Sequence, residues 1–363
     1  MKKLSKPGLM RALQSRREFL RDCVVIMGAT AIESLSIQGQ AARPKSAPAS
    51  HLVRFGKTEL FVSRLCQGTA FRQVTREAED PAAQRILRYC LDTGINFFDT
   101  SEAYGWGGSE MALGKAIIGK RHEVVICSKA SPGSEPDSSG KSAKMVFTPE
   151  ILSQKLEGSL KRLGTDYIDL YLLHGPDEVT PAESIADSMA GFVKSGKIRY
   201  WGVSNHSASM VGQFVKLAKR KGKAPIAGLQ DYYNIAAADR RDFMDRELFP
   251  LIDKGRLGLM AFSPLAEGRL APGRSIPKGS PLESLAAELD RVAKEMGVTR
   301  PQVCIAWVLT RPQATVVLAG AEKPEHVADN WKGAYLTLPP KAIQALNAAS
   351  DRYTQQLKSQ PKQ

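Results

Sequence analysis

The chain has 363 residues, 43% of them hydrophobic, which is enough apolar material for one large domain or two ordinary ones. No segment reaches the roughly 18 consecutive apolar residues of a membrane helix, so we expect no stable span in the mature protein. The formal net charge is +14, which raises the question of a nucleic-acid partner.

The distribution of charge argues against that partner. Residues 1–49 hold nine basic and three acidic side chains and so contribute +6 of the total. Elsewhere the basic residues are mixed with acids, and the one dense basic run, 217–223, ends a helical pattern. That run is interpreted as a solvated helix end or, alternatively, as an anion-binding patch. The five cysteines have neither CxxC nor metal-ligand spacing, so no metal is expected.

Residues 1–49 have the organisation of an export signal followed by a linker. Arg16 and Arg17, in the run SRREFL, precede a short, weakly apolar segment, and small residues follow near Ala41 and Ala49. The run resembles a twin-arginine signal, which predicts recognition by the twin-arginine export machinery and a periplasmic location. Glu33 interrupts the apolar segment, and an amphipathic or disordered tail is the alternative.

From residue 51 onward, short apolar runs alternate with segments of helical period. Residues 53–62 predict a small hairpin that turns at Gly56 and Lys57. The segment 148–164 predicts a helix, with Thr148 as its N-cap and Gly164 as its stop. Eight runs lack polar alternation, as parallel strands buried on both faces do. They are 64–68, 95–98, 123–128, 167–173, 198–203, 226–229, 257–262 and 315–318.

Eight strand–helix units in about 290 residues predict an α/β fold, a single (β/α)8 TIM barrel with an N-terminal β-hairpin. The barrel is expected over residues 51–350, followed by a polar C-terminal tail, 351–363. A doubly wound open sheet is the alternative, but its glycine-rich phosphate turn is missing after the first strand. Two polar segments, 131–147 and 266–284, are longer than the connections that a simple (β/α)8 barrel needs. They are expected to cover the active site.

Polar side chains stand where five successive predicted strands end. Since all strands of a barrel end at one mouth, we expect these side chains to converge there. Taken singly, each has an ordinary explanation, such as a helix cap, a surface charge or a hydrogen-bonded core histidine. The six are Asp99, Lys129, His174, Ser204, Asn205 and Gln230.

Tyr104, five residues beyond Asp99, completes a group that can transfer a proton. A lysine beside a tyrosine stabilises the phenolate and so lowers a pKa that starts near 10. An acid paired with Lys129 keeps the ammonium charged and in place. Tyr104 is then a general acid, and His174 can orient a carbonyl oxygen above it. The remaining half of such a reaction is a hydride, which a nicotinamide supplies.

Four segments, 94–117, 161–175, 196–205 and 261–268, closely resemble the aldo-keto reductases in sequence and in order. The resemblance covers about residues 52–348. It implies NAD(P)H-dependent reduction of an aldehyde or ketone to an alcohol, or the reverse reaction. It also implies that the catalytic tetrad consists of Asp99, Tyr104, Lys129 and His174.

The same resemblance implies the cofactor contacts. Ser204, Asn205 and Gln230 are implied to hold the nicotinamide carboxamide, Phe262 to stack on its ring, and a loop starting at Ser263, Pro264 and Leu265 to wrap the pyrophosphate. The remaining implied contacts are Gly68, Thr69, Gly320, Glu322, Lys323, His326 and Asn330. Glu322 stands where related sequences often carry a basic residue for the 2′-phosphate of NADP, so NAD is open as the alternative to NADP.

Two other classes of function compete with the reductase. One is a barrel that retains the cofactor but serves as a regulatory or binding subunit, as channel-associated members of the family do. The other is an unspecific anion binder, which the charge distribution disfavours. The substrate depends on segments 131–147 and 266–284, whose sequences do not name it.

Overall fold

The computed structural model describes residues 51–75, 80–136, 143–177, 179–220 and 222–359. The predicted export signal and linker lie outside these residues.

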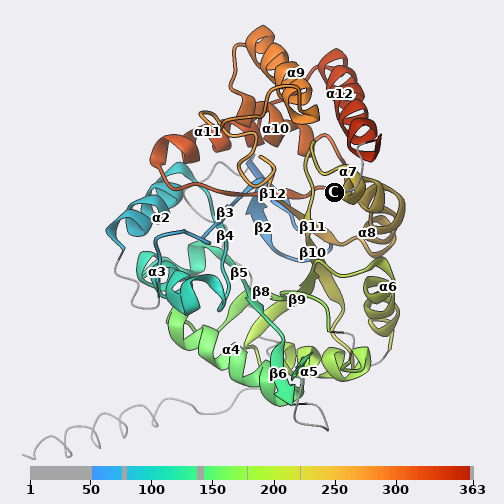
Figure 1. Ribbon diagram of the computed structural model, residues 1–363. Coiled ribbons are helices and arrows are strands. Elements are labelled where there is room, and N and C mark those ends of the chain that lie inside the picture. The colour runs from blue at the N-terminus through green and yellow to red at the C-terminus, as the bar shows by residue number, and fades with distance from the viewer. Residues whose placement is uncertain (1–50, 76–79, 137–142, 178, 221, 360–363) are drawn as a thin grey trace, which may run out of the picture. The chain divides into compact units, whose positions relative to one another are not determined.

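Eight parallel strands form a closed barrel, so the predicted (β/α)8 fold is confirmed (Figure 1). Around the barrel the order is β10-β11-β12-β3-β4-β5-β8-β9. Each predicted apolar run overlaps one of these strands. They are β3 (Leu65–Gly68), β4 (Phe97–Asp99), β5 (Val125–Ala130), β8 (Ile168–Leu173), β9 (Ile198–Ser204), β10 (Ile226–Tyr232), β11 (Gly258–Phe262) and β12 (Val316–Gly320).

Helices surround the barrel, and their buried apolar residues belong to the same hydrophobic core as those of the strands (Figure 1). They are α2 (Pro81–Thr93), α3 (Gly108–Ala116), α4 (Pro149–Leu163), α5 (Ala182–Lys194), α6 (Ala208–Leu217), α7 (Ala238–Phe243), α8 (Phe249–Gly255), α9 (Pro281–Met296), α10 (Arg300–Val308), α11 (Pro324–Ala334) and α12 (Pro340–Ser359). Short helical turns are η2 (Tyr104–Gly107), η3 (Arg121–Glu123) and η4 (Met244–Leu248).

Local signals in the sequence explain where α4 begins and ends. The Thr148 hydroxyl accepts the Ile151 amide at 3.3 Å, and Gly164 adopts a left-handed φ of 63°. At the other end of the chain, α12 continues past residue 350, where we expected a polar tail to begin. Tyr353 and Thr354 bury their side chains there, which extends the packed helix.

A β-hairpin closes the amino-terminal end of the barrel. Its strands, β1 (Leu52–Arg54) and β2 (Phe61–Ser63), pair antiparallel, and Gly56 turns between them with a φ of 55°. The ring of Phe55 packs so closely on Gly228 that a Cβ at that glycine would lie 2.4 Å from it. The hairpin thus covers the amino-terminal end of the barrel. The polar residues that end the strands lie at the opposite, carboxyl-terminal end.

The two long segments differ from one another. The segment that follows β5 forms a second hairpin, β6 (Gly133–Pro136) paired with β7 (Ala143–Val146), where a loop was expected. The segment after β11 is irregular over 263–280, and α9 begins at Pro281. Both lie at the carboxyl ends of barrel strands.

Candidate active site

The ammonium of Lys129 links two other predicted residues, Asp99 and Tyr104, at the barrel mouth. Lys129 reaches inward from β5 with its side chain fully buried, and its Nζ lies 2.7 Å from Asp99 Oδ2 and 3.0 Å from the Tyr104 hydroxyl. A third bond, 2.8 Å long, goes to the Thr100 carbonyl. The ammonium therefore has three oxygen partners and a fixed position beside the phenol.

A turn of unusual backbone geometry carries Tyr104. Directly after it, Gly105, Trp106 and Gly107 all have positive φ, at 56°, 51° and 91°. Such a conformation is costly for a bulky residue like Trp106 and is typical of functional sites. The turn folds the chain back so that the hydroxyl of Tyr104 meets Lys129.

Gln230 is bonded to the same carboxylate. Its Nε2 donates to Asp99 Oδ1 at 2.6 Å, so both oxygens of the acid have a donor. Among the described residues, the amide oxygen of Gln230 has no hydrogen-bond partner. The bond to Asp99 therefore orients the amide and leaves that oxygen for a ligand.

His174 lies beside Tyr104, at the end of β8. The two ring centroids are 5.5 Å apart and the planes meet at 79°. Its Nδ1 lies 3.1 Å from the Ser101 hydroxyl and 3.3 Å from the Ser131 hydroxyl. The structure thus brings all four predicted tetrad residues together.

Burial decides the charge states of the two rings. Burial raises the pKa of Tyr104 above its ordinary value, and the opposing effect of Lys129 does not overcome it. The prediction that the pKa of Tyr104 is lowered is therefore wrong. Lys129 does act to lower this pKa, but the loss of hydration raises it by more. Burial, reinforced by Lys129, lowers the pKa of His174 to about 4, so the imidazole is neutral near pH 7.

The charge of Lys129 is secured by its partners. Burial alone lowers the pKa of this ammonium, but Asp99, followed by Tyr104, raises it well above the ordinary value. A charged lysine and a protonated tyrosine are therefore held 3.0 Å apart. This pair can release a proton from the phenol while the ammonium stabilises the resulting phenolate.

Several residues at the mouth fit a nicotinamide group. The hydroxyl of Thr69 is buried and has no hydrogen-bond partner among the described residues. Because buried hydroxyls are normally hydrogen-bonded, a bound ligand is a suitable partner for it. Asn205 is exposed at a φ of 59°, and its amide donates to the buried Ser204 hydroxyl at 3.0 Å. Phe262 is partly exposed, and its aromatic ring suits stacking on a planar group.

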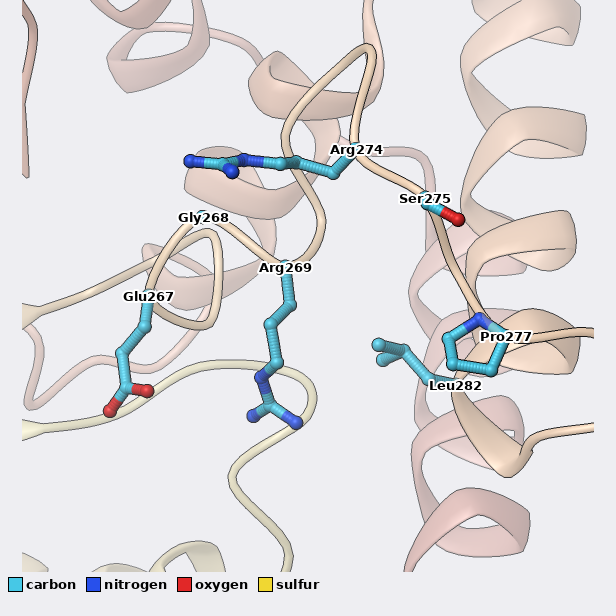
Figure 2. Close-up of a pocket in the computed structure, with 7 residues that line it drawn as sticks. All are labelled: Glu267, Gly268, Arg269, Arg274, Ser275, Pro277 and Leu282. Atoms are coloured by element: carbon cyan, nitrogen blue, oxygen red, sulfur yellow. The ribbon is translucent and has the colours of Figure 1, made fainter.

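The loop after β11 fits the phosphates of such a cofactor. Ser263, Ala266 and Glu267 have left-handed φ values of 57°, 51° and 59°, which wind the backbone tightly. The same loop lines a pocket of about 280 Å³, and Figure 2 shows Arg269 and Arg274 among its residues. Its lining comprises Glu267, Gly268, Arg269, Arg274, Ser275, Pro277 and Leu282. Guanidinium groups suit phosphate oxygens, and that of Arg269 also donates to the Ala266 carbonyl at 3.1 Å. The sequence interpretation named neither arginine.

The last strand places the residues expected near the adenosine. Gly320 pairs with Gly68 at the adjacent ends of β12 and β3. Glu322 is exposed and lies 3.9 Å from the guanidinium of Arg72, an ion pair that the sequence did not indicate. Lys323 and His326 are exposed at the start of α11, whereas Asn330 is 4% exposed and less accessible.

The sequence interpretation missed further groups around the tetrad. Ser101 and Ser131 contact His174, and Lys129 uses the carbonyl of Thr100. Ser101 could have been noticed, because it stands two residues after Asp99 and three before the predicted proton donor, Tyr104. In the described parts of the chain, no helix is long and apolar enough to cross a membrane, and no cluster of side chains has the composition of a metal site.

Comparisons with known proteins agree with this geometry. An oxidoreductase of Bacillus subtilis named YrpG, itself uncharacterised, is 33% identical, with 80% of this chain and 93% of that protein covered. A putative voltage-gated potassium channel subunit beta of Schizosaccharomyces pombe is 32% identical, covering 80% and 89%. A crystal structure of a thermostable aldo-keto reductase, Tm1743, in complex with the inhibitor epalrestat is 28% identical with a TM-score of 0.69, covering 82% and 99%.

The family model named "Aldo/keto reductase family" matches residues 64–351, nearly the whole described barrel. Together with the parallel barrel and the residues gathered at its mouth, this match identifies the chain as an oxidoreductase that belongs to the aldo/keto reductase family.

Proposed function

We propose that this protein reduces an aldehyde or ketone to an alcohol, or catalyses the reverse reaction, with a nicotinamide cofactor and with Tyr104 as the proton donor. The observation that carries the proposal is the position of the Lys129 ammonium, which lies 2.7 Å from Asp99 and 3.0 Å from the Tyr104 hydroxyl. A protonated phenol beside a fixed cation is suited to protonate a developing alkoxide.

Each residue of the site has a separate role in the proposed reduction. When bound, the nicotinamide supplies or accepts the hydride. His174 is neutral and can donate a hydrogen bond to the carbonyl oxygen of the substrate. Tyr104 gives its proton to that oxygen, and Lys129 stabilises the phenolate that is left. Asp99 keeps Lys129 charged and in place, and Gln230 fixes the second oxygen of the acid.

For the cofactor, we expect both NADP and NAD to bind, with a weaker preference for NADPH than is usual among such reductases. Glu322 repels a 2′-phosphate, which carries roughly −1.5 to −2 charges if it ionises as other phosphate monoesters do. The carboxylate can instead accept hydrogen bonds from a free 2′-hydroxyl. Arg72, at 3.9 Å, partly neutralises that carboxylate, and Lys323 and His326 add positive charge nearby.

We further propose that the chain is exported to the periplasm as a folded, cofactor-loaded protein. The support is the paired Arg16 and Arg17 followed by a weakly apolar segment. A barrel that needs its nucleotide is expected to acquire it in the cytoplasm, before export.

A regulatory subunit is the second candidate function, favoured by the relatives named as potassium channel subunits beta. The experiment that separates the two is to purify the protein, identify any nucleotide that travels with it, and screen aldehydes and ketones with both reduced nicotinamides. The proposal predicts multiple turnovers with at least one carbonyl class. Bound nucleotide without turnover across the panel contradicts it and supports the regulatory function.

A further inference from the structure

The hydroxyl of Ser101 has an unusually restricted environment. Ser101 is fully buried, and its Oγ accepts the backbone amide of Ala103 at 3.2 Å. The same Oγ lies 3.1 Å from His174 Nδ1. Among the described residues it has no other hydrogen-bond partner. Its hydrogen therefore points to Nδ1, because a buried hydroxyl hydrogen without an acceptor is costly.

This constraint determines where the imidazole of His174 carries its hydrogen. A neutral imidazole has one nitrogen that donates and one that accepts. If Nδ1 accepts from Ser101, the hydrogen is on Nε2. If Nδ1 carried the hydrogen instead, the Ser101 hydroxyl would have no acceptor. Ser131 Oγ also lies 3.3 Å from Nδ1, but it has the Glu102 carboxylate as an acceptor of its own and fits either tautomer, so the constraint comes from Ser101. No described residue forms a hydrogen bond with Nε2.

We propose that Ser101 is a positioning residue that holds His174 in the tautomer with the hydrogen on Nε2. This nitrogen then presents a donor to the oxygen of the substrate carbonyl, whichever carbonyl the protein takes. The use of that donor rests on the proposed reductase function. The tautomer itself does not, because it follows from the hydrogen bonds of the free protein.

The chain contains its own reference for the opposite tautomer. His206 is buried, and its Nδ1 lies 2.9 Å from the carbonyl oxygen of Ser204. A carbonyl oxygen only accepts, so Nδ1 of His206 carries the hydrogen. The partly buried His174 and the buried His206 are thus expected in opposite tautomers.

The test is nuclear magnetic resonance of the full chain with nitrogen-15-labelled histidine. Long-range correlations between ring hydrogens and ring nitrogens distinguish the two tautomers, and the chain has five histidines. The signal of His174 is assigned by its loss in His174→Gln. We expect the hydrogen on Nε2 in His174 and on Nδ1 in His206. Ser101→Ala should move His174 toward a mixture and leave His206 unchanged, whereas Ser101→Thr, which keeps the hydroxyl, should preserve the wild-type pattern.

A matched control exists at the closed end of the barrel. Ser63 is also fully buried, and its Oγ accepts the Asn96 amide at 3.3 Å and donates to the Leu65 carbonyl at 2.7 Å. Ser63→Ala therefore removes a similarly bonded hydroxyl far from His174 and should leave the His174 spectrum unchanged.

In the working enzyme, Ser101→Ala should lower kcat about 2- to 10-fold, the effect of one neutral hydrogen bond, with an unchanged dissociation constant for the nucleotide. The proposal is overturned if wild-type His174 carries its hydrogen on Nδ1, or if Ser101→Ala leaves the tautomer as it was. Both results are read from the spectrum, so they remain informative even if no carbonyl is reduced. A failed carbonyl screen overturns the proposed function alone.

Discussion

At the scale of single residues, burial has opposite consequences for the two rings that flank the barrel mouth. It keeps Tyr104 protonated by raising its pKa and keeps His174 neutral by lowering its pKa to about 4. Both shifts favour the uncharged form, as desolvation always does. A neutral hydrogen-bond donor and a protonated acid therefore coexist beside one permanent cation, Lys129.

The shift of His174 makes a prediction about stability and pH. As pH falls below the ordinary value of 6.5, the unfolded chain takes up a proton on this histidine, whereas the folded protein does so only near pH 4. Unfolding is therefore favoured progressively between these values, by at most about 3 kcal/mol from this group. We expect His174→Gln to lose less unfolding free energy than wild type between pH 7 and pH 5 in urea titrations. An identical pH dependence of the two proteins would refute the assigned shift.

Glu322 allows a test of cofactor discrimination. Glu322→Arg replaces the partner of Arg72 by a second cation, which should raise the NADPH-to-NADH affinity ratio by about 5- to 10-fold. Fluorescence quenching titrations with each nucleotide measure the ratio. Glu59→Arg is the control, because Glu59 also pairs with an arginine, Arg54, but on the hairpin at the closed end. If the ratio is unchanged in Glu322→Arg, or shifts equally in Glu59→Arg, Glu322 does not discriminate at the 2′ position.

At the scale of elements, the hairpin β1–β2 supports the site from the far end of the barrel. Phe55 fits against Gly228 and Gly258 because neither has a side chain. Gly228→Ala places a Cβ 2.4 Å from the Phe55 ring and should destabilise the fold by about 1–3 kcal/mol. The measurement is urea unfolding monitored by circular dichroism.

Gly191→Ala is the matched control for that substitution. Gly191 lies within α5, with no atom within 4 Å of a Cβ placed there, so alanine should be neutral or stabilising. Equal stability of the two variants would show that the hairpin is not packed as tightly as described.

The strands were predictable because their apolar runs are continuous, a pattern that only burial on both faces explains. The convergence of Asp99, Lys129 and His174 was predictable for a related reason, since polar residues that end parallel strands share one mouth. The ion pair between Arg72 and Glu322 could not be predicted, because it joins exposed side chains that are 250 positions apart in the sequence. The hairpin β6–β7 was missed since its polar sequence has the composition of a loop. The pKa of Tyr104 could not be predicted without knowing how deeply the phenol is buried.

At the scale of the whole molecule, we expect the basic segment 1–49 to direct export and the barrel to carry the chemistry. The export hypothesis predicts that Arg16→Lys combined with Arg17→Lys retains the protein in the cytoplasm, because the signal is read by a receptor and not by charge alone. Both substitutions preserve the net charge. Cell fractionation followed by immunoblotting provides the measurement. An undiminished periplasmic fraction of the double variant would contradict the twin-arginine interpretation.

The central claim for the molecule is that Tyr104 donates the proton in a hydride-transfer reaction, and Tyr104→Phe tests it most directly. The substitution removes the hydroxyl that Lys129 contacts at 3.0 Å and keeps the ring that packs on His174. In single-turnover measurements with a carbonyl substrate from the screen, we predict that the rate of nucleotide oxidation falls about 10²- to 10⁴-fold while nucleotide affinity is nearly unchanged. Turnover of the variant at a rate close to that of wild type would contradict the account.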